Sequence, residues 1–282
     1  MNGPDGIDLH SHSHYSDGAL SPAELVARAA AAGVHTLALT DHDCLAGLGE
    51  ARAAGERLGV RMIDGVEISA GWRAQTVHVL GLWLDPGHEP LHRHMAAQER
   101  RRLERIEQMC QRLERLRLPG TALRENVLGC TGVITRTHLA RAMVEAGLAR
   151  HVGDAFHRYL GQGKPAYRRV EWPSLAEAVS WIRAAGGHAV LAHPLRYRLS
   201  GGARRALLGE FRDQGGTGLE VVSGSNPGQP VETAAALARQ FGLAGTVGSD
   251  FHDPNLPWNP LGRLAKLPAH IMPLWDQARQ AT

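Results

Sequence analysis

Residues 7–18 read IDLHSHSHYSDG, a short apolar run followed by three histidines that alternate with two serines. Residues 7–10 predict a strand, and alternate side chains of a strand point to the same face. The serines, aspartate and glycine that follow are turn-forming residues. We therefore expect His10 and His12 to leave the strand end together, and His14 to turn away. Alone, the pattern fits either a metal site or an incidental cluster.

Helix and strand signals alternate outward from this stretch. Ser21, Pro22 and Glu24 form a helix start with a capping residue, a proline at the first helical position and a glutamate three residues after the cap. An alternation of this kind predicts an α/β fold built on a parallel sheet or a barrel. We expect helices at 21–33, 44–59, 174–185, 203–214 and 230–241, and strands at 34–40, 60–69, 76–84, 188–194, 218–224 and 243–250.

The alternation of strand and helix signals stops between residues 98 and 170. Helical patterns take its place at 98–116, 135–147 and 153–163. In the first of these, apolar residues recur at helical spacing and predict a buried face: Leu103, Ile106, Cys110 and Leu113. The arginine run 100–102 lies among glutamates and predicts a solvated helix face rather than an RNA-binding patch. We predict a barrel made of 1–97 and 171–282, with 98–170 inserted as a small helical domain.

Composition excludes some classes of protein and leaves others open. Of 282 residues, 43% are hydrophobic, which allows a sizeable core, and the formal net charge of +3 suits an anionic substrate. The scattered Cys44, Cys110 and Cys130 argue against a disulfide framework and favour a reducing, cytoplasmic setting. We see no signal peptide, no apolar run near the roughly 18 residues of a membrane span, and no sign of an obligate protein partner.

Histidines and carboxylates recur at the predicted carboxyl ends of successive strands, the edge where βα barrels and α/β sheets form their sites. Taken singly, His78 fits a core histidine, and the segments TDHD (40–43) and SDFHD (249–253) fit helix caps. Together they predict a metal site, since buried charges need partners or metals. Mixed imidazole and carboxylate ligands suit manganese, zinc or iron(II), and their number implies two or three divalent ions. The usual substrate of such a site is a phosphate ester.

The ordered motifs DLHSHSHYSDG, LTDHD, GVEIS, VHVLG, AHP and GSDFH resemble those of the PHP (polymerase and histidinol phosphatase) family of phosphoesterases. The resemblance covers both halves of the chain outside the insert. It implies a distorted seven-stranded (β/α) barrel with a trinuclear site. Its implied ligand sets are His10, His12, Glu67 and Asp250 for one ion, Glu67, His78 and His193 for the second, and Asp17, His42 and His252 for the third.

A closer resemblance lies in ITRTHLARAMVEAG, YLGQGKPAY, HPLRY and PWNPLGR, which look like bacterial 3′,5′-nucleoside bisphosphate phosphatases and a related 5′-to-3′ exoribonuclease. It implies removal of the 3′-phosphate of a nucleotide such as pAp, and cleavage of short 5′-phosphorylated RNA by the same displacement. A metal-bound hydroxide would attack, and we identify no general acid. Candidate substrate-binding residues in these motifs are Arg136, Lys164, Arg196 and, more weakly, His138, against the alternative of ordinary surface charge.

Three aspartates near the motifs have two interpretations. Asp8, Asp41 and Asp43 either orient ligand imidazoles or cap turns. Alternative functions are a histidinol phosphatase, against which the long arginine-bearing insert argues, and an inert PHP accessory module. The inert module would lack ligands or carry attached polymerase sequence, and this chain shows neither.

Overall fold

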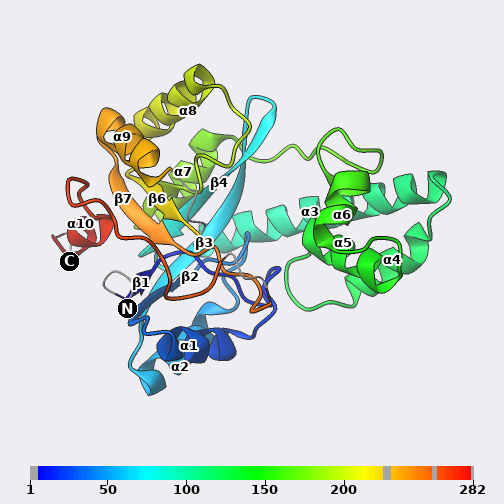
Figure 1. The fold of residues 1–282 in the computed structure, drawn as a ribbon, viewed down its shortest axis with the longest axis horizontal. Coiled ribbons are helices and arrows are strands. Elements are labelled where there is room, and N and C mark those ends of the chain that lie inside the picture. Colours follow the sequence, from blue (N-terminus) through cyan, green and yellow to red (C-terminus); the bar gives the residue numbers. More distant parts are fainter. Residues whose placement is uncertain (1–5, 225–229, 256–258, 281–282) are drawn as a thin grey trace.

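The computed structural model describes residues 6–224, 230–255 and 259–280 and has an α/β fold, as predicted. Seven strands form one sheet in chain order (Figure 1). The sheet curls until its two edges meet, because the Leu9 amide donates to the Val247 carbonyl at 2.9 Å. The strands are β1 (Ile7–Asp8), β2 (Thr36–Leu39), β3 (Arg61–Trp72), β4 (Gln75–Leu82), β5 (His188–Leu191), β6 (Gly218–Ser223) and β7 (Ala244–Gly248).

Helices pack around the outside of this barrel, and a second group stands beside it (Figure 1). The barrel helices are α1 (Pro22–Ala31), α2 (Leu48–Leu58), α7 (Leu175–Ala184), α8 (Gly201–Asp213), α9 (Val231–Phe241) and α10 (Leu274–Gln280). The second group contains the far half of α3 (Glu89–Arg115), α4 (Gly120–Leu128), α5 (Arg136–Glu145), α6 (Val152–Ala155) and the π-helix η1 (Phe156–Leu160). None of the helices in the described ranges is long and apolar enough to cross a membrane.

Local sequence signals account for the ends of several helices. At α1 the Ser21 side chain accepts from the Glu24 amide and the Glu24 side chain accepts from the Ser21 amide, which confirms the predicted capping box. Helix α2 ends at Gly59, whose φ of 70° lies in the left-handed region that glycine adopts without strain. It begins at Leu48, later than the predicted residue 44, because the preceding residues form the loop that carries His42.

Strand β4 departs from the parallel arrangement of the other strands. It forms a hairpin with β3 and runs antiparallel to both β3 and β5. Its first residues therefore lie at the barrel edge where the parallel strands end. His78 is the fourth residue of β4, so the reversal brings a residue from the start of a strand to the same edge as Glu67 of β3.

Helix α3 joins two separate apolar clusters and is the element in which the sequence pattern misled most. Its first half places Leu91 and Met95 in the barrel core, and its second half places Ile106 and Met109 in a second cluster with α4 and α5. Leu103, expected on the buried face, is 37% exposed, and Arg102, expected in solvent, is 6% exposed. The short helix α4 was not predicted. The division into barrel and inserted domain stays a prediction.

Candidate metal centre

Nine histidine and carboxylate side chains meet at the barrel edge. Six separate segments of the chain supply them: Glu67 lies within β3, His78 lies near the beginning of β4, and the others follow the carboxyl ends of parallel strands. Three groups among the described residues could hold a metal ion, each with ligand atoms within 4.8 Å of one another: His12, Asp17, His42 and His252; His10, His12, Glu67 and Asp250; and His42, Glu67 and His78. His193 lies beside the third group.

Glu67 lies at the centre of this arrangement and is fully buried. One of its oxygens, Oε1, lies 2.8 Å from His78 Nδ1 and 3.1 Å from His193 Nε2. The other, Oε2, faces three more imidazole nitrogens at 2.9–3.4 Å, those of His10, His12 and His42. Each oxygen of Glu67 therefore faces a different set of imidazoles at the centre of the cluster.

Asp17 and Asp250 complete the two sides of the cluster. Asp250 Oδ1 lies 3.3 Å from the Nε2 atoms of both His10 and His12. Asp17 Oδ1 lies 3.3 Å from His252 Nε2 and 3.8 Å from His42 Nε2. His14 belongs to none of these groups: it is half-buried with its ring against Tyr15, as the turn formers around it indicated.

Several buried atoms of the cluster have no hydrogen-bond partner among the described residues. They include Asp17 Oδ1, Glu67 Oε2, His42 Nδ1 and His193 Nδ1. His42 Nδ1 and Glu67 Oε2 are only 2.9 Å apart, yet their orientation is not that of a hydrogen bond. Unsatisfied buried polar atoms cost free energy, and a cation between them would satisfy several at once. The residues present therefore fit bound divalent metal ions.

The charges of the cluster support the same interpretation. Burial alone would raise the pKa of Glu67, but the facing imidazoles, His42 and His78 foremost, hold it well below its usual range. Burial lowers the pKa of His42 to about 4, so its ring is neutral and its lone pair is available to a cation. His12 is also buried, but Asp250 and Glu67 raise its pKa to about 10. A bound cation would displace that proton.

Glu220 of β6 was not foreseen in the sequence. It is 1% exposed, and its Oε1 lies 2.9 Å from His10 Nδ1, the ring nitrogen that faces away from the cluster. Its Oε2 accepts from the His193 amide at 2.6 Å. A carboxylate behind an imidazole fixes the ring orientation and tautomer. The only sequence signal was a single acidic residue in the mostly apolar segment 218–224.

Of the three aspartates with two interpretations, Asp8 and Asp41 accept hydrogen bonds from loop residues, and Asp43 joins α3 to β3. Asp41 accepts from the Ser13 amide at 2.8 Å and the Ser16 hydroxyl at 2.6 Å, which shapes the turn after His12. Asp8 accepts from the Ser249 amide at 2.9 Å. Asp43 instead binds the Arg102 guanidinium through Oδ2 and the Ser69 amide through Oδ1.

Backbone strain accompanies two of the strand ends. His193 follows β5 with φ of 30°, and Asp250 follows β7 with φ of 53°, both in the left-handed region that non-glycine residues rarely adopt. Such conformations persist where the surrounding structure holds them, and they gather at functional sites. The Asp250 amide donates to the His10 carbonyl at 2.9 Å, which ties the two ends of the barrel together at the cluster.

Comparison with known proteins places this geometry in a family. The PHP domain model matches residues 8–105. A 5′-3′ exoribonuclease of Haemophilus influenzae is 41% identical over 96% of this chain and 98% of its own length. A 3′,5′-nucleoside bisphosphate phosphatase of Chromobacterium violaceum is 42% identical over 96% of this chain and 95% of its own length. The chain belongs to the PHP family.

A solved structure agrees over the whole fold. An amidohydrolase from Chromobacterium violaceum, with bound sulfate and no metal, superposes with a TM-score of 0.91 at 40% identity, and covers 98% of this chain and 96% of its own. Helices α4, α5 and α6 therefore lie within the part of the chain that this match covers.

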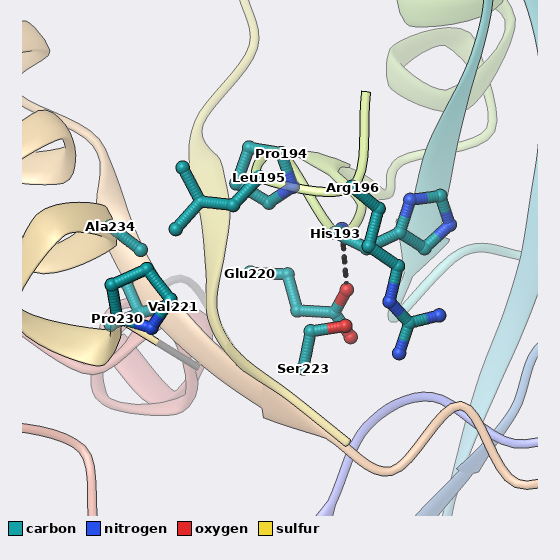
Figure 2. Close-up of a pocket in the computed structure, with 9 residues that line it drawn as sticks. All are labelled: His193, Pro194, Leu195, Arg196, Glu220, Val221, Ser223, Pro230 and Ala234. Atoms are coloured by element: carbon teal, nitrogen blue, oxygen red, sulfur yellow. Dashed lines mark hydrogen bonds between the residues drawn. The ribbon is translucent and has the colours of Figure 1, made fainter. Parts of the chain in front are cut away.

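Two of the four candidate substrate-binding residues lie close to the PHP cluster. Arg196 pairs with Asp250 and is half-exposed. It lines a cavity of about 170 Å³ together with His193 and Glu220, and Figure 2 shows its guanidinium beside the His193 ring. Arg136 begins α5, where Asp17 is one of the charges that act on it, and its guanidinium lies 5.5 Å from the Phe156 ring centroid.

The other two candidates have structural contacts of their own. His138 Nδ1 accepts from the Thr135 amide at 3.0 Å and so caps α5, which leaves its other ring nitrogen for any contact with a substrate. Lys164 lies half-buried in the turn after η1, where its amide donates to the Gly161 carbonyl. Residues 257 and 258 of the motif PWNPLGR lie outside the described residues.

Insert residues missed in the sequence also reach the cluster. The Thr135 hydroxyl donates to Asp17 Oδ2 at 3.0 Å, and the Arg141 guanidinium donates to the Asp17 carbonyl at 2.9 Å. Val133 extends this contact through its amide, which donates to the Tyr15 carbonyl at 2.9 Å. The start of α5 therefore packs directly on the loop that carries Asp17.

Proposed function

We propose that this protein is a metal-dependent phosphatase that removes the 3′-phosphate of nucleoside 3′,5′-bisphosphates. The observation that carries the proposal is the meeting of nine potential ligands with Glu67 at their centre, where a cation would satisfy several unpaired buried atoms. The proposed ligands are His10, His12, Asp17, His42, Glu67, His78, His193, Asp250 and His252. We propose manganese as the ion, with zinc or iron as alternatives of similar ligand preference.

When bound, clustered divalent cations lower the pKa of a water molecule and neutralise charge on the phosphoryl oxygens. The protein's part is to hold the cluster and to orient the phosphate. Glu220 and the Asp250 carbonyl each lie against the outer nitrogen of a ligand ring, on His10 and His252 respectively, and hold those rings in place. Arg196 is placed to bind a phosphoryl oxygen beside Asp250, where a planar guanidinium suits developing charge.

The substrate's other phosphate would lie toward the insert. Arg136 is largely buried at the start of α5, which packs on the Asp17 loop, and it forms no ion pair with a carboxylate among the described residues. An anionic group between Arg136 and the metal ions would be stabilised by both. The insert then acts as a lid that selects nucleotides, with Lys164 and His138 as further candidates on it.

A second activity, 5′-to-3′ cleavage of short 5′-phosphorylated RNA, requires the same displacement with a nucleotide as the leaving group. The name of the Haemophilus influenzae relative supports it. We place the protein in the cytoplasm, since Cys44, Cys110 and Cys130 are all free thiols, as suits a reducing compartment.

The decisive experiment measures phosphate release, with added manganese, from 3′,5′-bisphosphoadenosine, histidinol phosphate and a 5′-phosphorylated oligoribonucleotide. We expect turnover of the bisphosphate and none of histidinol phosphate. Turnover of histidinol phosphate alone would replace the proposed substrate class.

The lid is tested separately with Arg136→Ala and Lys164→Ala. Each should raise KM for the bisphosphate, because the phosphate that is not cleaved loses a cation. Wild-type KM and kcat in both variants would remove the insert from substrate recognition.

A further inference from the structure

A strongly basic cavity of about 420 Å³ lies on the insert side of α3, outside the metal cluster. One wall is α3, and the other is the chain segment that returns from η1 toward the barrel. Four arginines and only two glutamates line it, so its charge is positive: Arg101, Glu104, Arg105, Gln108, Arg168, Arg169, Val170 and Glu171. Nothing in the cleavage of a mononucleotide requires it.

The innermost arginine of this cavity lacks a counter-ion. Arg105 is 7% exposed, and its Nε donates to the Arg168 carbonyl at 3.2 Å. Among the described residues no aspartate or glutamate forms an ion pair with it. Burial, reinforced by Arg136 and Arg102, lowers the pKa of Arg105 well below its usual range. Burial of a charged group without a partner costs free energy, and an anion bound beside Arg105 would offset that cost.

The outer arginines are held by neutral groups and so keep their charge available. Arg101 donates to Gln98 Oε1 at 3.0 Å, Arg169 donates to the Arg73 carbonyl at 3.1 Å, and Arg168 donates to Gln108 Oε1. Arg168 and Arg169 are exposed. These contacts orient the side chains without neutralising them, as a site for a phosphate requires.

The back of the cavity is linked electrostatically to the start of α5. Arg136, at that start, is among the charges that act on Arg105. The same start of α5 packs on the loop that carries Asp17 of the metal cluster. A single nucleotide would reach Arg136, and a longer strand would reach the cavity.

We propose that this cavity binds a backbone phosphate of a single-stranded RNA substrate, one or more nucleotides away from the phosphate that is cleaved. The proposal rests on the proposed function and deepens it. An RNA chain longer than a mononucleotide would have binding contacts of its own in this cavity. Arg168 and Arg169 contact the phosphate from solvent, and Arg105 supplies the buried charge.

The test compares two double variants with equal change of charge. Arg168→Gln with Arg169→Gln removes two cavity cations, and Arg93→Gln with Arg100→Gln removes two exposed cations of α3 outside the cavity. Binding of a fluorescent, 5′-phosphorylated pentaribonucleotide with phosphorothioate linkages is followed by anisotropy at several salt concentrations, with competition by 3′,5′-bisphosphoadenosine. Binding is measured without turnover, so the result stands apart from the phosphate-release assay of the proposed function.

We expect the cavity variant to weaken pentanucleotide binding about tenfold, at least fivefold more than it weakens bisphosphate binding. The slope of log Kd against log salt should fall by about 0.7 for each RNA phosphate that the variant no longer neutralises. The control pair should keep both the affinity and the slope of the wild type. Equal losses for the two ligands, or an unchanged salt slope, would overturn the proposal.

Discussion

The barrel and the insert both bury charged side chains, but with opposite balance. At the barrel edge, Asp17, Glu67 and Asp250 face imidazoles and leave buried oxygens that a cation would satisfy. In the insert, Arg105 and Arg136 lie largely buried without carboxylate partners among the described residues. Metal ions would complete the first region, and an anion would complete the second. The difference indicates how a phosphate ester would be held, with its cleaved phosphate on the barrel and its remaining charge on the insert.

Helix α3 itself contains one buried arginine with a carboxylate partner and one without in the described part of the chain. Arg102 and Arg105 are one turn apart and almost equally buried, at 6% and 7% exposure. Arg102 has its carboxylate, Asp43, in a two-nitrogen contact, and Arg105 has none in the part of the chain that the structure describes. Arg102 is therefore neutralised within the fold, and Arg105 keeps its charge without a carboxylate partner in the same described part of the chain.

The largest expected effect is that of a substitution at Glu67, the central carboxylate of the barrel cluster. Glu67→Gln removes the charge that both groups of imidazoles share, and we expect kcat to fall about a thousandfold, since metal-ion charge stabilisation is worth several kcal/mol. Metal content per chain, measured by plasma mass spectrometry, should fall with it. Glu56→Gln, on the exposed face of α2, is the matched control. Full metal content together with full activity would remove Glu67 from the centre.

The next largest effect is a difference in stability between substitutions of Arg102 and Arg105, the two buried arginines of α3. Arg102→Met leaves the Asp43 carboxylate buried without its cation, which should lower the free energy of unfolding by about 3–5 kcal/mol. Arg105→Met breaks no ion pair and relieves repulsion from Arg102 and Arg136, so its change should stay within about 1 kcal/mol. Urea unfolding of both variants measures the contrast. Equal destabilisation would show that Arg105 also stabilises the fold.

Removal of metal ions should destabilise the barrel through the same buried atoms. A ligand held at a hundred times its Kd stabilises the folded state by about 2.7 kcal/mol. Chelation should therefore lower Tm by several degrees, and added manganese should restore it. Differential scanning calorimetry with and without chelator measures this. An identical Tm in both samples would contradict metal binding at this cluster.

A smaller effect is expected at the residue behind His10. Glu220→Gln keeps the size of the side chain but removes the charge that orients the ring, and loss of such a partner typically weakens metal affinity or activity about 10–100-fold. Metal titration by calorimetry gives the affinity, with Glu232→Gln on the exposed face of α9 as control. Wild-type affinity in Glu220→Gln would limit the role of Glu220 to its contact with the His193 amide.

Much of the barrel and of the candidate site could be predicted because strand ends carry their own signals. The helix starts at Ser21 and Ser174 are local, and both form the capping boxes that their sequences indicate. The ordered His and Asp motifs identified the edge at which the side chains meet. The antiparallel course of β4 could not be predicted in this way, since a strand's direction depends on its neighbours and not on its own residues.

The sequence by itself determined which chemistry is available: imidazoles and carboxylates at successive strand ends, in an order that the PHP family shares. Only the tertiary structure decided which charges are compensated. Glu220 lies behind His10 although 210 positions of chain separate them, and Arg102 contacts Asp43 from 59 positions away. Helical periodicity made no distinction between Arg102 and Arg105, because compensation of a buried charge depends on partners from distant segments that folding alone brings within reach.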